Sequence, residues 1–238
     1  MKTTRTRLAS TLAAGLIGSA ALMTTSTALA FDPSVDASLG ISSMYLWRGT
    51  DLGDGDAQVA GSLDFDSGVG AYAGVWTSSG DSGAGQEYDL YAGYATDITE
   101  DVSVDAGVIN YIYPDQSKVD DDGNYVSQTG FGDFSEAYLG ISAYGFGVDY
   151  YNDITSADYQ YVNASYGYGP FGIAVGRHIF DDENPSSAYG EDMTHLDLSF
   201  QFNDELSFTT STMVDSDTDD AARQTTFIQV TYAKSFSL

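Results

Sequence analysis

Cysteine is absent from the 238-residue sequence, and basic residues are scarce. Without cysteine the chain has no disulfide scaffold, no thiol nucleophile and no cysteine zinc site. Eight lysines and arginines stand against 35 aspartates and glutamates, which gives a formal net charge of −27. Such a chain cannot build the positive surface that phosphate backbones and anionic lipid headgroups require, so nucleic acid is excluded as a partner.

Long hydrophobic runs are also missing after the first 30 residues. A membrane-spanning helix needs about 20 consecutive apolar residues, and no stretch beyond residue 30 approaches this length. A helical membrane protein is therefore excluded. A disordered chain is not predicted either, because 42% of the residues are hydrophobic and the sequence contains 18 tyrosines and 12 phenylalanines.

The first 30 residues have the three parts of a secretory signal peptide. These are a basic start, a short apolar segment at 12–23, and an Ala-Leu-Ala cleavage motif that ends at Ala30; the basic residues are Lys2, Arg5 and Arg7. The sequence predicts export with cleavage after Ala30, which leaves one domain over residues 31–238. An uncleaved membrane anchor is less favoured, because the apolar segment is followed by a cleavage motif and not by the charged residues that end a membrane anchor.

The rest of the chain alternates apolar and polar residues. Near the C-terminus Ile228, Val230 and Tyr232 fall on one parity, and Gln229 and Thr231 fall on the other. This pattern predicts a strand with one apolar face. Similar runs, bounded by turn-forming residues, predict twelve strands and no amphipathic helix. The predicted strands begin near residues 35, 57, 69, 87, 102, 134, 146, 157, 171, 193, 206 and 224.

The connections between these strands alternate in length. Residues 49–56, 78–86 and 114–133 form long connections, whereas 67–68 and 97–101 form short ones. Long loops at one end and short turns at the other are typical of an outer-membrane barrel with an even number of strands. The predicted fold class is all-β, a transmembrane antiparallel up-and-down β-barrel of about 12 strands, in contact with outer-membrane lipid of a Gram-negative bacterium.

A soluble secreted β-sandwich or barrel is the alternative fold. It also alternates apolar and polar residues, but it fills its interior with apolar groups and has no reason to sort its loops by length. The loop sorting, the strand lengths and a C-terminal strand that ends in Phe236 and Leu238 favour the membrane form.

The segment from Ser43 to Gly49, Ser-Met-Tyr-Leu-Trp-Arg-Gly, resembles the S-N-Y-V-W-R-G motif of the TorF family of proteobacterial porin-like proteins. Met44 replaces the asparagine of that motif. Further segments resemble later parts of the family in order and spacing; they are residues 72–76, 87–94, 111–114 and 136–140. The resemblance covers the mature chain and implies an outer-membrane barrel that acts as a porin.

If the apolar parity faces lipid, the opposite parity carries many carboxylates into the barrel, with Arg48 as the clearest inward base. The acids are Asp36, Asp64, Asp66, Glu87, Asp89, Asp105, Glu136, Asp149, Asp158 and Asp197. Dry unpaired carboxylates are costly, so these side chains are expected to be hydrated in a water-filled lumen. The sequence therefore predicts a narrow channel for small hydrophilic solutes with a preference for cations, and the 114–133 loop is the candidate for its restriction.

Two other functions stay open: a closed barrel with a structural or surface-interaction role and, less favoured, an outer-membrane hydrolase. His195 and Asp197 share a parity, but the sequence has no G-x-S-x-G motif and no nucleophile placed beside His178 or His195. No enzyme activity and no cofactor are predicted. The acidic runs at 120–124 and 215–220 do not complete a calcium loop, so no metal site is predicted.

Four further residues test the assignment of faces. Trp47 and Trp76 are interpreted as part of an interfacial aromatic girdle. Arg177 and Lys234 fall on the outward parity, where a cation is costly unless it lies near a strand end and reaches the headgroups, or unless a β-bulge shifts the parity. Nothing in the sequence marks a subunit interface.

Overall fold

The structure is a computed structural model and describes residues 32–114, 117–119, 125–127, 132, 134–155, 159–180, 192–216 and 226–238. The predicted signal peptide, Asp158, the acidic run at 120–124 and most of the 114–133 loop lie outside the described residues. Among those residues, none belongs to a helix that is long and apolar enough to span a bilayer.

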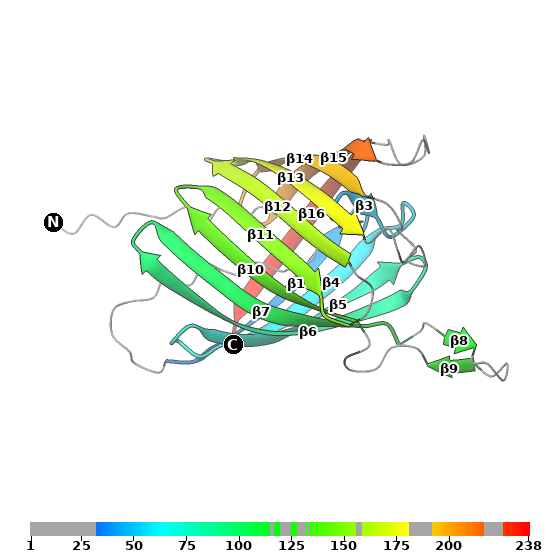
Figure 1. Cartoon of the computed structure of the whole chain (residues 1–238), viewed down its shortest axis with the longest axis horizontal. Helices are drawn as coiled ribbons and strands as arrows, with labels where there is room; N and C mark the ends of the chain where they lie inside the picture. The colour runs from blue at the N-terminus through cyan, green and yellow to red at the C-terminus, as the bar shows by residue number, and fades with distance from the viewer. Residues whose placement is uncertain are drawn as a thin grey trace.

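Twelve antiparallel strands form a closed barrel (Figure 1). They are β1 (Ser34–Ser42), β4 (Gln58–Asp66), β5 (Ala71–Asp81), β6 (Gly85–Thr99), β7 (Val102–Ile112), β10 (Ser135–Ala143), β11 (Phe146–Asp153), β12 (Tyr159–Tyr168), β13 (Phe171–Phe180), β14 (Met193–Gln201), β15 (Leu206–Ser216) and β16 (Thr226–Ser237). Strand β1 pairs with both β4 and β16, which completes the ring of backbone hydrogen bonds. The predicted all-β antiparallel barrel is confirmed, and each strand begins within two residues of its predicted start.

Two short hairpins are not part of the hydrogen-bonded ring of strands. Strands β2 (Leu46–Trp47) and β3 (Thr50–Asp51) pair within the connection between β1 and β4. Strands β8 (Ser117–Val119) and β9 (Tyr125–Ser127) pair within the connection between β7 and β10.

The two faces of the barrel wall have opposite chemistry. On β1, Leu39 and Ile41 are 62% and 51% exposed, whereas Ser42 is buried. Ser38, on the same parity as Ser42, bonds to the hydroxyl of Ser62 on the neighbouring strand. Large exposed apolar side chains occur on other strands at Leu63, Leu90, Val108, Leu139, Val148, Ile173, Leu198 and Ile228. The outer face is apolar and the inner face is polar and aromatic, the reverse of the arrangement that the soluble alternative predicts.

The predicted sorting of loops by length has one error. Residues 78–86 were expected to form a long connection, but β5 continues to Asp81 and β6 begins at Gly85. The carboxylate of Asp81 accepts the backbone N–H groups of Gly83 and Ala84, both at 2.7 Å. Such an Asp-centred turn closes a tight hairpin, which explains why both strands extend further than the alternation suggested.

Candidate functional site in the barrel interior

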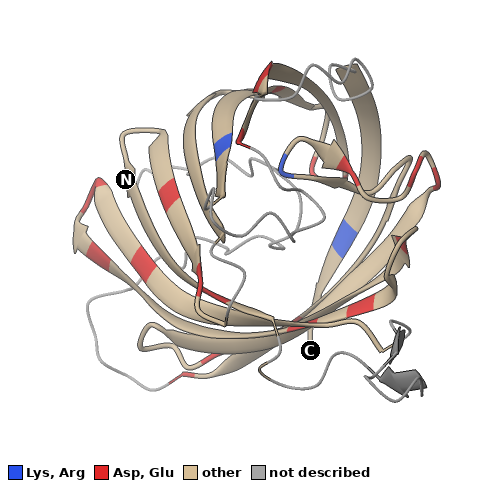
Figure 2. Cartoon of the chain, turned by 45° about the vertical axis from the view of Figure 1, so that its right-hand side comes forward, with Lys and Arg blue, Asp and Glu red and all other residues tan. Residues whose placement is uncertain are grey.

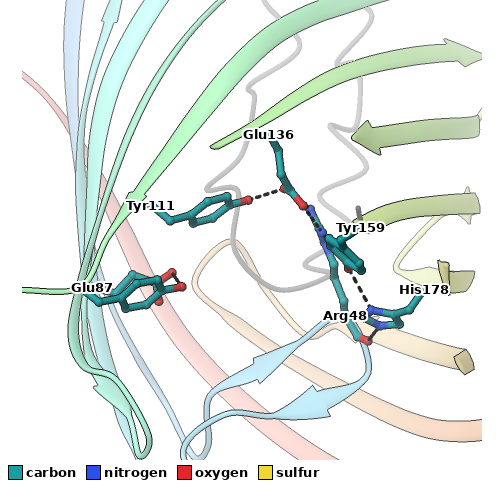
Figure 3. Close-up of polar contacts among 7 residues, drawn as sticks. Arg48, Glu87, Tyr111, Glu136, Tyr159 and His178 are labelled. Carbon is teal, nitrogen blue, oxygen red and sulfur yellow. Dashed lines mark hydrogen bonds and ion pairs between the residues drawn. The ribbon is translucent and has the colours of Figure 1, made fainter. Parts of the chain in front are cut away.

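The connection between β1 and β4 folds into the barrel. This inserted loop, residues 43–57, carries β2 and β3, and Tyr45, Leu46 and Trp47 are buried on it. Figure 3 shows the β2–β3 hairpin between the strands of the wall, with the side chain of Arg48 directed at Glu136. The inserted loop therefore fills part of the interior, a role that sequence analysis gave to the 114–133 loop.

Gly49 allows the inserted loop to lie against the wall. Its φ is +82°, a conformation that favours glycine. A Cβ at this position would lie 2.4 Å from Cγ of His195 on β14. Both the backbone conformation and the close approach to the wall require glycine next to Arg48.

Arg48 forms a buried, two-pronged ion pair with Glu136 of β10. Nη1 and Nη2 of Arg48 each donate a hydrogen bond of 2.8 Å to one carboxylate oxygen of Glu136. Nη1 also donates to the hydroxyl of Tyr159 at 3.0 Å, and Tyr111 donates to Glu136 Oε2 at 2.6 Å (Figure 3). Burial acts to lower the pKa of Arg48, but the charge and hydrogen bonds of Glu136, together with the nearby phenols of Tyr159 and Tyr111, outweigh it, so this pKa lies above its usual value.

Aromatic rings surround the same guanidinium. Cζ of Arg48 lies 4.4 Å from the ring centroids of Tyr151 and Tyr161, and 4.6 Å from that of Trp47. At these distances the electron-rich ring faces stabilise a cation. Arg48 thus neutralises one acid and is further held by ring faces.

Two buried histidines of the wall lie beside the inserted loop. Nε2 of His178 donates to the backbone oxygen of Arg48 at 2.7 Å, since a carbonyl only accepts, and Nδ1 lies 2.9 Å from the hydroxyl of Tyr159. His195 lies 2.9 Å from Asp197 and 2.8 Å from the hydroxyl of Tyr161. The expected proximity of His195 and Asp197 is present, and the other nitrogen of His195 contacts a phenol.

Glu87 and Asp89 of β6 form a second acidic group inside the barrel. The hydroxyls of Tyr45 and Tyr113 donate to Glu87 at 2.5 and 2.8 Å. Burial, followed by the charge of Glu87, raises the pKa of Tyr45, so this phenol stays protonated and can donate. Oδ1 of Asp89 has no hydrogen-bond partner among the residues that the structure describes.

The expectation that the interior acids are hydrated is wrong in this part of the barrel. Glu136, Glu87 and Asp89 are 0%, 1% and 2% exposed, and Asp197 is buried too. The inserted loop covers this region, and phenol hydroxyls, a histidine and Arg48 take the place of water as partners. The alternation of residues along each strand assigns phenols and carboxylates to the same inward face, so it could not show that these acids are covered.

The other interior acids remain partly exposed. Tyr91 donates to Asp64, Tyr72 donates to Asp105 at 2.6 Å, and Asn163 donates to Asp149 at 3.3 Å. None of these three acids forms an ion pair among the described residues. Figure 2 shows acidic positions on many strands and loops, and few basic ones.

Asp36 and Asp66 lie at strand ends, close to the short turns. Asp36 accepts the hydroxyl of Ser237 at 2.7 Å, and Asp66 accepts the N–H of Gly68 at 2.9 Å. Asp66 therefore stabilises a turn. Among the described residues, no group of three or more histidine, aspartate or glutamate side chains is arranged to hold a metal ion.

The outward-facing cations have acidic partners near strand ends. Arg177 pairs with Asp192 at 2.8 Å and with Asp215 at 3.4 Å, and the β14–β15 register shifts beside these residues. Lys234 pairs with Glu205 in a short turn at 2.9 Å. These pairs agree with the expectation that both cations are tolerated near the strand ends.

The two tryptophans do not form an interfacial girdle. Trp47 and Trp76 are each 8% exposed and pack inside the barrel with Tyr45, Leu52, Tyr159 and Tyr161. The expectation was wrong because the inserted loop carries Trp47 inward, and Trp76 lies on the inward parity of β5 next to Tyr45, with ring centroids 6.2 Å apart.

Comparison with known proteins gives one family and several similar folds. A family model described as a bacterial protein of unknown function (Gcw_chp) matches residues 29–237. No curated protein matches the sequence. A solved structure described as KdgM porin has 8% identity and a TM-score of 0.46, and the match covers 86% of this chain and 99% of that one. The outer membrane protein OprD from Pseudomonas aeruginosa has 10% identity and a TM-score of 0.39, with 86% and 66% covered.

Proposed function

The chain belongs to the Gcw_chp family of bacterial proteins, and from the chemistry of its two barrel faces we propose that it is an outer-membrane, porin-like channel for small hydrophilic solutes. A closed barrel with an apolar outer face and a polar inner face is the arrangement of outer-membrane barrels. The resemblance of residues 43–49 to the TorF family is consistent with this proposal.

The apolar outer face is the observation that carries the location. Leu39, Ile41 and Leu63 are each at least half exposed and lie on the paired strands β1 and β4. Contiguous exposed apolar surface is unfavourable in water and marks an interaction site or a membrane contact. A closed ring of strands also satisfies every backbone group that would be unsatisfied in hydrocarbon, so the barrel suits a lipid environment.

The size and contents of the interior support a narrow channel. Side chains alone fill a barrel of about eight strands, and a barrel of twelve encloses more space. The inserted loop takes up part of that space, with Tyr45, Trp47 and Arg48 packed against the wall. Partly exposed acids line the other part, so a solute would pass polar groups and a restriction formed by the inserted loop.

The balance of charge supports a preference for cations. Glu136 pairs with Arg48, which is the one arginine or lysine inside the described part of the barrel. Asp64, Asp105 and Asp149 contact phenols and an amide, which carry no positive charge that could neutralise these acids. Carboxylates along a pore raise the local concentration of cations and repel anions.

A closed barrel with a structural or surface-interaction role is the second candidate. The observation that favours it is the tight fit of the inserted loop, in which Arg48 and Glu136 are both buried. Planar-bilayer recording of the refolded mature protein separates the two functions. The channel predicts discrete conductance steps, whereas a closed barrel that inserts correctly, as shown by heat-modifiable gel mobility, gives none.

A further inference from the structure

The guanidinium of Arg48 comes from the inserted loop, but most of the groups around it belong to the barrel wall. Glu136 lies on β10, Tyr151 on β11, and Tyr159 and Tyr161 on β12. We call these four residues the wall cage. Three neighbouring, hydrogen-bonded strands position the wall cage, so its geometry is set by the barrel and not by the inserted loop.

Glu136 is oriented for a forked ligand independently of Arg48. Tyr111 of β7 donates to Glu136 Oε2 at 2.6 Å, and both side chains are buried. A carboxylate held in one plane accepts two parallel N–H groups from a guanidinium. The rings of Tyr151 and Tyr161, each with its centroid 4.4 Å from Cζ of Arg48, receive the faces of the same planar cation. This combination selects guanidinium over an ammonium group, which offers no planar fork.

The side chain that occupies the wall cage is attached to the tight turn between β2 and β3. Arg48 has a φ of 45° and Gly49 a φ of 82°. An L residue such as arginine is disfavoured at positive φ. The β2–β3 hairpin imposes these angles, because Trp47 pairs with Thr50 and a two-residue turn needs positive φ at both central residues, whether or not the side chain of Arg48 stays in the wall cage.

Two further acids are buried in the same part of the interior as the wall cage. Glu87 and Asp89 are buried without an ion pair among the described residues, and Asp89 Oδ1 has no hydrogen-bond partner there. Arg48 already pairs with Glu136.

We propose that the wall cage is a binding site for solutes that carry a guanidinium group, and that Arg48 occupies it when no such solute is present. The proposal deepens the channel function and rests on it for the passage of solute, because an entering guanidinium competes with Arg48 for Glu136 and releases the inserted loop. Binding in the wall cage does not itself require conduction.

Chemical rescue tests the site. Arg48→Ala leaves the wall cage without its tethered guanidinium, and n-propylguanidinium is then titrated into the refolded mature protein in detergent. We expect saturable changes in tryptophan fluorescence and a rise in Tm. The affinity for n-propylammonium should be at least roughly tenfold lower, because an ammonium group cannot donate two parallel N–H bonds to one carboxylate. The double variant Arg48→Ala/Glu136→Gln should lose the response.

Arg177→Ala is the matched control, because it removes the outward-facing arginine that pairs with Asp192. Because Arg48 still occupies its wall cage, this variant should respond like the wild type, only at much higher n-propylguanidinium concentrations than Arg48→Ala. The proposal is overturned if Arg48→Ala shows no saturable response, or if the control responds at equally low concentrations. Should Arg48→Ala fail to refold, the wild type is titrated with agmatine and with putrescine. Agmatine alone should change the fluorescence of Trp47 beside Arg48, and equal effects or none overturn the proposal.

The same samples separate this inference from the channel function. Guanidinium binding without conductance steps in bilayers supports the wall cage and overturns the channel. Conductance without saturable guanidinium binding supports the channel and overturns the wall cage.

Discussion

Arg48 and Glu136 are 88 residues apart in sequence and meet inside the barrel through two hydrogen bonds of 2.8 Å. One partner belongs to the inserted loop and the other to the wall, so this pair fixes the loop in the interior. Removing one member of a buried ion pair leaves an uncompensated charge, whereas removing both does not.

Arg48→Ala should destabilise the barrel more than Arg48→Ala combined with Glu136→Gln. Loss of one partner of a buried pair costs about 3–5 kcal/mol, and the double variant should recover part of that. Urea unfolding of the detergent-solubilised protein measures both. A double variant that is less stable than the single variant by the full cost of Glu136→Gln would show that the pair is not coupled.

Gly49→Ala should be more destabilising than Gly55→Ala. Both glycines have positive φ, but a Cβ at Gly49 would lie 2.4 Å from His195, whereas one at Gly55 meets nothing within 4 Å. The control should cost about 1–2 kcal/mol from the backbone conformation alone. The free energy of unfolding of the two variants gives the difference, and equal values would contradict the packing of the inserted loop against β14.

The carboxyl pKa of Glu205 should lie below the usual glutamate value of about 4.3. Hydrogen bonds from Lys234 and then Tyr232 lower it. A lowered pKa in the folded state contributes stability above the unfolded-state pKa, and this is lost as pH falls through the folded value. NMR titration of Glu205 in wild type and in Lys234→Met checks the shift. An unchanged pKa in the variant would show that Lys234 is not its cause.

Asp105→Asn and Asp149→Asn should each reduce the cation preference of the channel. Both acids are partly exposed inside the barrel and form no ion pair among the described residues. Neutralisation removes a charge from the pore lining. The permeability ratio of potassium to chloride should fall in each variant, while Asp204→Asn, in the turn between β14 and β15, should leave it near the wild-type value. A fall of equal size in the control would assign the selectivity to the surface charge.

Alternation of side chains was sufficient to predict the strands. The apolar parity of Ile228, Val230 and Tyr232 faces outward on β16, where these three side chains are exposed and Gln229 between them is buried. Turn-forming residues placed the strand ends, except after β5, where Asp81 closes a short turn inside a segment that looked like a loop.

The arrangement of the interior could not be predicted in the same way. A period of two residues assigns Glu87 and Glu136 to the inner face, but it does not show which groups of other strands approach them. The burial of these acids depends on the inserted loop, and its position results from long-range contacts of Arg48, Trp47 and Tyr45. The S-M-Y-L-W-R-G motif was the available signal, because it concentrates an arginine and two aromatic residues next to a glycine.

The reversal potential of refolded residues 31–238 in a planar bilayer, with a potassium chloride gradient across it, is the most direct test of the central proposal. Asp64, Asp105 and Asp149 are partly exposed and form no ion pair among the described residues. They predict discrete channels whose reversal potential lies toward the equilibrium potential of potassium. Channels whose reversal potential lies toward the equilibrium potential of chloride would contradict the acidic lining. A correctly inserted barrel without any current would contradict the channel itself.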